Sequence, residues 1–404
     1  MLQFHSSSNS VVNSKRAMAE CIENALEGQN NLDCDLIIFY TTMGHNFKDL
    51  LSEARRLSPK AEIVGCTGAG VIGREGSNES MRALAIMAIK GEKNKFAVIA
   101  RESIIGSDSF EIATEMAKEL KNKAPGITMI HFLPSFCILH ERAIEGFESV
   151  FGPEVNIFGS VSGDNMKFIT SFQFYNEKVL EMGAVAVGFA DSELDIITKA
   201  NHGFEIMGGA PFEVTQADFP FIVELNGQPA WRFFSDRLGF PETAFWGEVG
   251  TVGQLAEKLP AELHEEYGSE YILRIPVEKD GRIFAPHRSI CQKGKELWLA
   301  RRNESGIFKG VDLMLEQIID GCGGRKPLAV FQADCGLRGK LSLNRVLKDE
   351  ITNRIQSPLS KDQDVPWLGL YGWGEFTKLG GRNHIHFFTT SLYVILERTR
   401  DMKK

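Results

Sequence analysis

Ile63-Val64-Gly65-Cys66-Thr67-Gly68-Ala69-Gly70-Val71-Ile72-Gly73 is the stretch from which the fold of this 404-residue chain is best approached. A short apolar run enters a series of small residues, which predicts a strand that ends where the backbone can approach a neighbour closely. Glycine permits positive φ and removes side-chain bulk, and both properties suit a ligand that lies against backbone N–H groups. A tight turn without any ligand is the plainer alternative.

The first half of the chain alternates between helical and strand patterns around this stretch. Apolar residues recur with a helical period, and the short apolar runs between them are typical of buried strands. Strands 82–89 and 96–102 are expected to be neighbours, joined by the polar turn 90–94. The predicted helices cover residues 14–29, 47–57, 112–120 and 141–151, and the other predicted strands cover 36–40 and 128–133.

The second half contains more hairpin signals. Residues 171–175 and 179–190 are predicted to pair around Asn176-Glu177, and Asp280-Gly281 marks another turn. Frequent hairpins favour antiparallel or mixed pairing over a purely parallel sheet. We therefore predict an α/β protein of two mixed modules, with largely antiparallel or mixed sheets and a boundary near residues 190–220.

Composition narrows the class of protein. A net charge of -8 argues against a nucleic-acid surface, and no apolar run is long enough to cross a membrane. The N-terminus lacks the pattern of a secretory signal, so we expect a cytoplasmic protein. The seven cysteines contain no C-x-x-C pair, which favours reduced thiols over disulfides or structural zinc.

Further strand ends rich in small residues occur around Gly159, Cys335 and Glu375. Arg338 can grip a carboxylate, although Asp334 is an alternative partner for it. Glu375 can accept hydrogen bonds from an amine or from backbone. We predict that these strand ends form one ligand site, with the candidate residues Gly65, Cys66, Thr67, Gly70, Gly159, Ser160, Asp164, Asn165, Cys335, Arg338 and Glu375.

Catalytic and metal patterns are weak. A cysteine-dependent enzyme would use Cys66 or Cys335, but neither has a base nearby in the sequence, so we expect a protein that is not an enzyme. No spacing of histidine and cysteine predicts zinc. A single imidazole can ligate haem iron, which leaves four candidate haem ligands, each of which is also a plausible structural residue: His131, His140, His384 and His386.

The ordered motifs resemble the FIST sensory family. The segments 63–70 and 158–165 are similar to two conserved stretches of its N-terminal domain, and 225–230, 335–339 and 372–376 to its C-terminal domain. Residues 386–389 fit another position less well, because Phe387 and Phe388 replace a polar pair. The resemblance implies a FIST N-terminal domain over 1–195 and a FIST C-terminal domain over 196–404.

This resemblance also implies a function. Members of the family are intracellular sensors of small ligands, with amino acids or their derivatives proposed as ligands. A chain without an output domain would signal in trans, for example to a separate histidine kinase. A haem-dependent nitric oxide sensor that regulates a histidine kinase is the more specific alternative.

Overall fold

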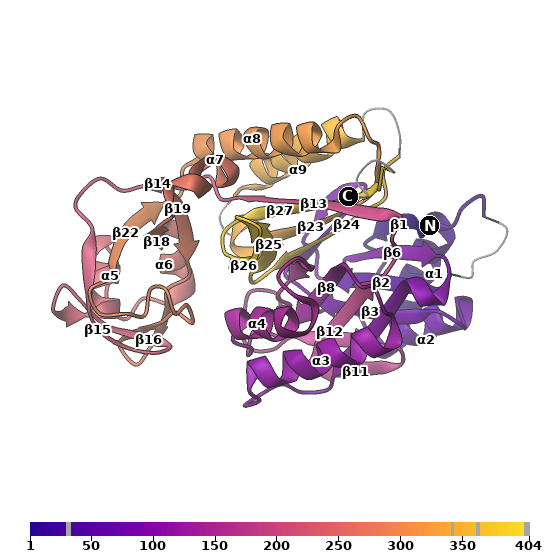
Figure 1. Ribbon diagram of the computed structural model, residues 1–404, viewed down its shortest axis with the longest axis horizontal. Helices are drawn as coiled ribbons and strands as arrows, with labels where there is room; N and C mark the ends of the chain where they lie inside the picture. Colours follow the sequence, from indigo (N-terminus) through magenta and orange to yellow (C-terminus); the bar gives the residue numbers. More distant parts are fainter. Residues whose placement is uncertain (30–33, 341–342, 361–363, 400–404) are drawn as a thin grey trace. The chain divides into compact units, whose positions relative to one another are not determined.

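The computed structural model describes residues 1–29, 34–340, 343–360 and 364–399, and it has an α/β fold (Figure 1). The described residues form two compact units. Unit 1 holds residues 1–200, 315–385 and the chain from 389 on, and unit 2 holds residues 201–314 and 386–388. Residues after 195 therefore contribute to both units, whereas the sequence places one boundary at 195/196.

Unit 1 is built from three repeats of one pattern, which is a strand, a helix, a strand, a helix, a strand, a hairpin and a last strand. Repeat 1 comprises β1 (Gln3–Asn9), α1 (Ser14–Ala25), β2 (Leu36–Thr41), α2 (Phe47–Leu57), β3 (Glu62–Thr67), β4 (Gly70–Gly73), β5 (Gly76–Asn78) and β6 (Leu84–Lys90). Repeat 2 comprises β7 (Phe96–Arg101), α3 (Ser109–Lys123), β8 (Met129–Pro134), α4 (His140–Phe151), β9 (Asn156–Ser160), β10 (Phe172–Tyr175), β11 (Lys178–Glu181) and β12 (Ala184–Phe189).

Repeat 3 follows the same order but is interrupted after its first strand by most of unit 2, which also includes residues 304–314 of the next helix. It comprises β13 (Leu194–Asn201), α8 (Glu304–Cys322), β23 (Pro327–Cys335), α9 (Arg345–Leu359), β24 (Trp367–Gly372), β25 (Glu375–Leu379), β26 (Arg382–His386) and β27 (Thr390–Glu397). Short 3-10 turns, η1 (Lys93–Lys95) and η3 (Gly336–Arg338), complete this unit.

The repeats are locked together by an exchange of hairpins between sheets. Each sheet has a parallel pair at its centre, β2 with β3, β8 with β9 and β23 with β24. The hairpin at one end of each sheet comes from another repeat, because β4 pairs with β24, β10 with β3 and β25 with β9. No repeat therefore completes a sheet from its own strands.

The ends of β3, β9 and β24 meet in a closed set of backbone hydrogen bonds, which we call the strand-exit ring. In every repeat the donor lies two residues after the acceptor, so the three bonds are equivalent. They are Gly163 N to Thr67 O (3.0 Å), Ala69 N to Tyr371 O (2.9 Å) and Trp373 N to Val161 O (2.9 Å). The predicted convergence of small-residue strand ends is thus a property of the fold.

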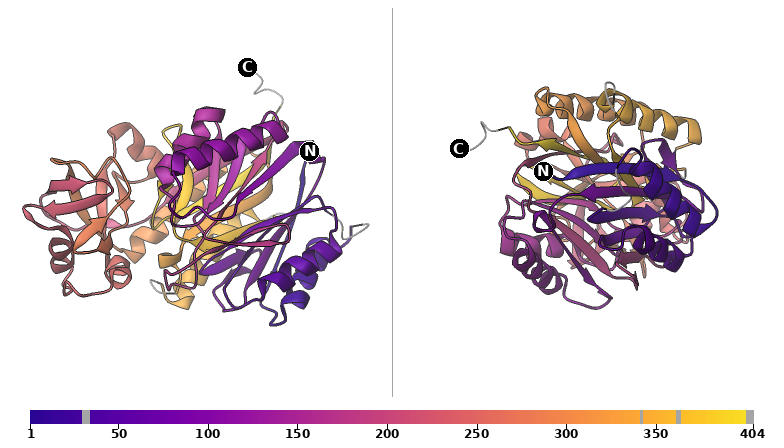
Figure 2. Two further views of the ribbon diagram at one scale, coloured as in Figure 1. Left: turned by 90° about the horizontal axis from the view of Figure 1, so that it is seen from below. Right: turned by 90° about the vertical axis from the view of Figure 1, so that its right-hand side faces the viewer.

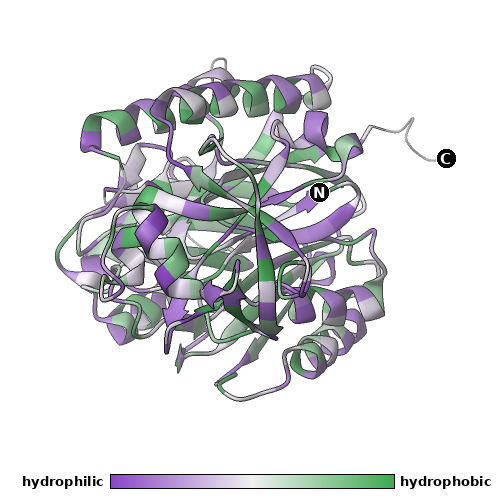
Figure 3. Cartoon of the chain, turned by 90° about the vertical axis from the view of Figure 1, so that its left-hand side faces the viewer, coloured by the Kyte–Doolittle hydropathy of each residue, from purple (hydrophilic) through white to green (hydrophobic). Residues whose placement is uncertain are grey.

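Successive side chains along each strand point to opposite faces of the sheet, and the two faces pack into two separate layers of core. Ile37 and Phe39 of β2 point toward α1 and α2, and they pack with Met18 and Leu50. Ile38 and Tyr40 point the other way, into a core shared by strands of all three sheets. Figure 2 shows the helix pairs on the outside of the sheets, and the helices in Figure 3 carry both hydrophilic and hydrophobic bands.

Local sequence signals predicted most elements and missed their pairing. The helix over 47–57 is confirmed as α2, and Asn46 caps it by accepting a hydrogen bond from Asp49 N. The expected neighbours 82–89 and 96–102 are wrong, because β6 pairs with β1 and β2 whereas β7 pairs with β12. The hairpin at 176–177 is present, but its second strand ends at Glu181 and β12 joins another sheet.

The glycines of the opening stretch do not adopt positive φ as expected. None of Gly65, Gly68 and Gly70 is among the positive-φ residues of the described chain. Their role is close approach, because a Cβ on Gly65 would lie 2.0 Å from the carbonyl oxygen of Phe39. Side-chain absence, and not backbone freedom, is what this stretch requires.

Unit 2 has its own antiparallel sheet and its own core. The core packs Trp231 and Phe234 against Leu255 and Leu297. Its elements are β14 (Glu205–Ile206), β15 (Phe212–Asp218), β16 (Phe221–Leu225), β17 (Gln228–Pro229), α5 (Ala230–Arg237), α6 (Trp246–Val252), β18 (Gly253–Lys258), η2 (Ala261–Leu263), α7 (His264–Tyr267), β19 (Tyr271–Arg274), β20 (Val277–Lys279), β21 (Arg282–Phe284) and β22 (Glu296–Arg301).

Candidate functional site

Repeat 3 concentrates charged side chains at the strand-exit ring. Asp334 lies near the end of β23, Arg338 lies in η3 directly after it, and Glu375 begins β25. All three are buried, with exposed fractions of 4%, 4% and 0%. We call these three residues, together with Thr389, the third-repeat site.

Glu375 is the least compensated group of this site. Its Oε2 accepts hydrogen bonds from the Oγ1 of Thr389 at 2.8 Å and from the Thr389 backbone N at 3.4 Å. Its Oε1 is buried and has no hydrogen-bond partner within the described residues. Burial, reinforced by the neighbouring Asp334 carboxyl, raises the pKa of Glu375 well above its ordinary value.

Two other acids, Glu79 and Asp334, lie near cations of the chain. Glu79 forms a buried ion pair with Lys348, at 2.6 Å between Oε2 and Nζ. Burial raises the pKa of Asp334, while the positive charge of Arg338 acts in the opposite direction. Oδ1 of Asp334 has no hydrogen-bond partner among the described residues. The charge of Arg338 also acts on Glu375, so one cation faces two buried carboxyls.

The equivalent position of repeat 2 shows how a structural residue is accommodated there. Gln173 pairs with Cys66 just as Glu375 pairs with Ser160. The Oε1 of Gln173 accepts from Gly183 N, which corresponds to the bond from Thr389 N to Glu375. Nε2 of Gln173 donates to Ser162 and Ser171, so the amide is satisfied on both sides.

Repeat 3 departs from this arrangement in two ways. An acid replaces the amide, and Gly372 stands where repeat 2 has Ser162, one residue after each ring acceptor. Glu375 therefore has no counterpart of the Ser162 hydroxyl, which is one of the partners of Gln173. Since a buried polar atom without a partner costs free energy, this departure indicates a use for the acid other than folding.

The predicted residues of repeat 1 lie at the ring with structural contacts. Thr67 is buried, and its Oγ1 donates to the carbonyl of Gly163 at 2.8 Å. Cys66 is buried in the shared core, where desolvation raises the pKa of its thiol. A Cβ on Gly70 would lie 2.6 Å from the Cγ of Glu79, so Gly70 lets that acid approach.

The predicted residues of repeat 2 also lie at the ring. Gly159 adopts positive φ, and Ser160 donates its hydroxyl hydrogen to the carbonyl of Gly374 at 3.0 Å. Asp164 is buried, and its carboxylate accepts hydrogen bonds from the backbone N–H groups of residues 167–170. Asn165 is half-buried, and its Nδ2 lies 3.5 Å from the Sδ of Met81.

The segment after β23 joins these strand ends. Cys335 is buried and pairs with Gly372, and a Cβ on Gly336 would lie 3.5 Å from the Cβ of Ala69. The structure therefore brings the strand ends that carry all eleven predicted ligand residues to one side of unit 1. Of these residues, Arg338 and Glu375 bear the charges of the third-repeat site, and Asp164 is committed to its own loop.

The candidate haem ligands are spread through the molecule. His131 is fully buried, its Nε2 lies 2.7 Å from the hydroxyl of Tyr40, and its ring stacks on Phe158. Burial lowers its pKa to about 3. His140 and His386 are also buried, whereas His384 is half-buried. The three buried imidazoles lie in packed surroundings, so they do not fit haem as they stand.

Metal sites of another kind are also not seen. Within the described residues, no group of three or more histidine, cysteine, aspartate or glutamate side chains is placed to hold a metal ion.

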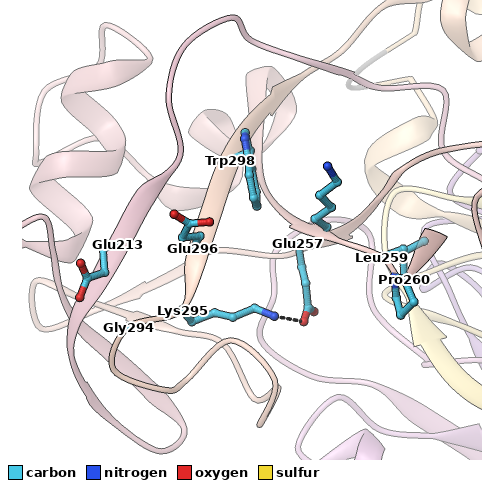
Figure 4. Close-up of a pocket in the computed structure, with 9 residues that line it drawn as sticks. Glu213, Glu257, Leu259, Pro260, Gly294, Lys295, Glu296 and Trp298 are labelled. Atoms are coloured by element: carbon cyan, nitrogen blue, oxygen red, sulfur yellow. Dashed lines mark hydrogen bonds and ion pairs between the residues drawn. The ribbon is translucent and has the colours of Figure 1, made fainter.

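Unit 2 contains a cleft of about 710 Å³. In Figure 4, Glu213 and Glu296 lie on one side of it, Leu259 and Pro260 on the other, and Trp298 between them. Glu257 forms one ion pair with Lys295, at 2.9 Å, and another with Arg274. Burial opposes ionisation, but these charges lower the pKa of Glu257 to about 2. The pattern is that of a satisfied structural network.

Sequence reasoning did not find Thr389, Glu79 and Lys348. Thr389 was noted only as the end of an imperfect motif, and Glu79 and Lys348 lie 269 residues apart. Their pairing follows from the hairpin exchange, since β4 and β5 of repeat 1 join the sheet of repeat 3. Glu375, by contrast, is one of the candidates named from the sequence, as an acid in an otherwise small and apolar strand end.

Comparison with known proteins gives one family match. Residues 35–228 match the model of the FIST N domain, which supports a FIST-family protein. No curated protein sequence matches the chain. No helix in the described ranges is long and apolar enough to span a membrane.

Similarity to solved structures is slight. A cyanuric acid hydrolase from A. caulinodans has a TM-score of 0.36 and 8% identity, covering 99% of this chain and 100% of that one. A second cyanuric acid hydrolase structure has a TM-score of 0.35 and 9% identity, covering 98% of this chain and 100% of that one. PurLQS from Thermotoga maritima has a TM-score of 0.22 and 9% identity, covering 98% and 73%. These values carry no functional argument.

Proposed function

With the FIST N domain match as the premise, we propose that this chain is a sensory protein that binds a small ligand in the third-repeat site. It acts in signal transduction in trans, on a separate output protein such as a histidine kinase. It is a binding protein and not an enzyme. The cysteines that a catalytic mechanism would use, Cys66 and Cys335, are both buried.

The observation that carries this proposal is the buried acid Glu375, whose Oε1 has no hydrogen-bond partner among the residues that the structure describes. Repeat 2 supports the same fold with a fully satisfied amide at the equivalent position, Gln173. An acid that the fold does not need, at the meeting point of three glycine-rich strand ends, is typical of a ligand contact.

Thermal unfolding with a panel of amino acids and small polar metabolites tests the proposal. A ligand that binds the folded state at about 100 times its Kd stabilises it by about 2.7 kcal/mol, so the midpoint rises with concentration. Glu375→Gln is expected to abolish this rise, whereas the exposed control Glu102→Gln keeps it. If no compound raises the midpoint, or if both variants respond as wild type does, the assignment of the site fails.

A haem-dependent nitric oxide sensor is the second proposal. Its support within the chain is His384, the candidate imidazole that is half-buried and not fully buried. The absorption spectrum of the protein supplied with haem is the direct measurement. A Soret shift that is lost in His384→Ala and kept in His131→Ala supports this proposal, and an unshifted spectrum contradicts it.

A further inference from the structure

The charge balance at the third-repeat site indicates what kind of ligand it takes, if the proposed function holds. Among the acids of the surroundings, Glu79 has an ion pair with Lys348, whereas the one charge of Arg338 acts on both Asp334 and Glu375. Glu375 receives neutral donors only, from the backbone and hydroxyl of Thr389. The charge that the site lacks is therefore positive.

The unpartnered atoms point to the same chemistry. Oε1 of Glu375 and Oδ1 of Asp334 are both buried acceptors without a hydrogen-bond partner in the described part of the chain. The Asp334 carboxyl is close enough to raise the pKa of Glu375 further. A group with several N–H donors and a positive charge can satisfy both oxygens, and such charge-assisted bonds are the stronger kind.

We propose that the ligand presents a cationic N–H group, such as a primary ammonium, to Glu375 and Asp334, and that Glu375 releases its proton to solvent when this cation binds. Without a ligand, Glu375 is a neutral carboxylic acid. On binding, its O–H bond is broken, the proton leaves, and the carboxylate and the cation pair. The cation brings one positive charge into the buried site and the departing proton removes one, so the net charge of the site does not change.

The groups that face Glu375 from the surrounding elements agree with this assignment. Asp334 comes from β23, Arg338 from η3 and Tyr393 from β27. Burial raises the pKa of Tyr393, which keeps its phenol neutral. The charge of Arg338 acts on Asp334 as well as on Glu375, so it offsets the charge of one of the two carboxyls. A ligand carboxylate would instead bring a further negative charge next to two acids.

Infrared difference spectroscopy tests the proposal directly. The unliganded protein is expected to show the carbonyl band of a protonated carboxylic acid that is missing in Glu375→Gln. Methylammonium is expected to remove this band, whereas tetramethylammonium, which has no N–H, and acetamide, which has no charge, are expected to leave it. Affinity for methylammonium should fall about 10- to 100-fold in Glu375→Gln, as for a lost charged hydrogen bond.

The outcomes separate this inference from the proposed function. If the band is absent from the free protein, or if methylammonium leaves it unchanged, the inference is overturned. A neutral or anionic compound that raises the unfolding midpoint of wild type but not of Glu375→Gln would retain the sensor site and reject the cation. Glu375→Gln copies the amide of Gln173, so it is expected to fold. Circular dichroism of the variant checks this, and Asp334→Asn is the second variant, expected to weaken the same binding.

Discussion

At the scale of single residues, Gly65 shows why a glycine lies inside a buried strand. A Cβ there would lie 2.0 Å from the backbone oxygen of Phe39 and 3.2 Å from its ring. Because β2 is held on both sides by neighbouring strands, it cannot move away. Gly65→Ala is therefore expected to reduce the free energy of unfolding by about 1–3 kcal/mol, as overpacked cores do.

Urea unfolding measures this loss. Gly250→Ala in α6 is the matched control, since its Cβ would meet nothing closer than 3.5 Å. In a helix, alanine is expected to be more stable than glycine by up to about 1 kcal/mol. Equal effects of the two substitutions would show that close approach at Gly65 is not a constraint.

The buried acid Glu375 makes stability depend on pH. Burial raises its pKa in the folded state above the ordinary 4.5 of the unfolded state. The folded state then holds more protons than the unfolded state above about pH 4.5, so the free energy of unfolding falls as pH rises through that value. Glu375→Gln removes this contribution, and the variant is expected to gain stability over wild type from pH 4.5 to 7.

Urea unfolding at several pH values measures the difference between the two proteins. Subtracting the two curves isolates Glu375, because other acids, such as Glu193 with a pKa lowered to about 2 by hydrogen bonds to the N-terminal amine and Lys95, contribute equally to both. A difference that stays constant over this range would mean that Glu375 is ionised in the folded protein.

At the scale of elements, the exchanged hairpins depend on side chains at their turns. Asn176 directly follows β10 and lies in the left-handed region, with φ of 55°. Its Oδ1 accepts from Ile63 N at 3.1 Å and from Arg55 at 3.0 Å, and its Nδ2 donates to Glu62 at 2.9 Å. One side chain of repeat 2 thus anchors the hairpin on β3 of repeat 1.

Asn176→Ala is expected to lower the free energy of unfolding by about 2–3 kcal/mol, since it removes these bonds and strains a left-handed position. Glu177→Ala is the control from the same turn. Its partner Arg55 is 3.9 Å away and the side chain is 74% exposed, so its loss is expected to cost less than about 1 kcal/mol. A cost for Asn176→Ala as small as that of Glu177→Ala would contradict the anchoring role.

Elements were largely predictable from local patterns, whereas their partners were not. The period of residues 47–57 and the cap at Asn46 are local, and they predicted α2 correctly. The polar turn 90–94 resembles a hairpin turn, but β6 and β7 belong to different sheets. β6 pairs with β1, the first strand of repeat 1, and β7 pairs with β12, the last strand of repeat 2. Pairing over long sequence distances has no local signal.

The candidate site was predictable only in those features that depend on local sequence. Glycine-rich strand ends predicted the ring, and Arg338 and Glu375 were named from their residue types. The free oxygen of Glu375 was not predictable, because it depends on Gly372 in place of a serine and on Thr389 from the last strand. The sequence shows no solenoid period, so the threefold pattern is visible only in strand pairing.

At the scale of the whole molecule, the two units have separate cores and are expected to unfold separately. Phe158 is fully buried in the shared core of unit 1, and Trp231 is buried in the core of unit 2. Replacing either by alanine is expected to cost about 3–5 kcal/mol in its own unit. Calorimetry should show two transitions, with Phe158→Ala lowering one and Trp231→Ala lowering the other. A single transition shifted by both variants would contradict independent units.

The place where repeat 3 is interrupted has a practical consequence. Most of unit 2 lies between β13 and α8, and the same connection is short in the other repeats, between β1 and α1 and between β7 and α3. The fold thus already accommodates a foreign domain at one of three equivalent loops. The loops at residues 10–13 and 102–108 are accordingly the rational insertion points for a fluorescent protein, which would turn the chain into an optical reporter of its own ligand.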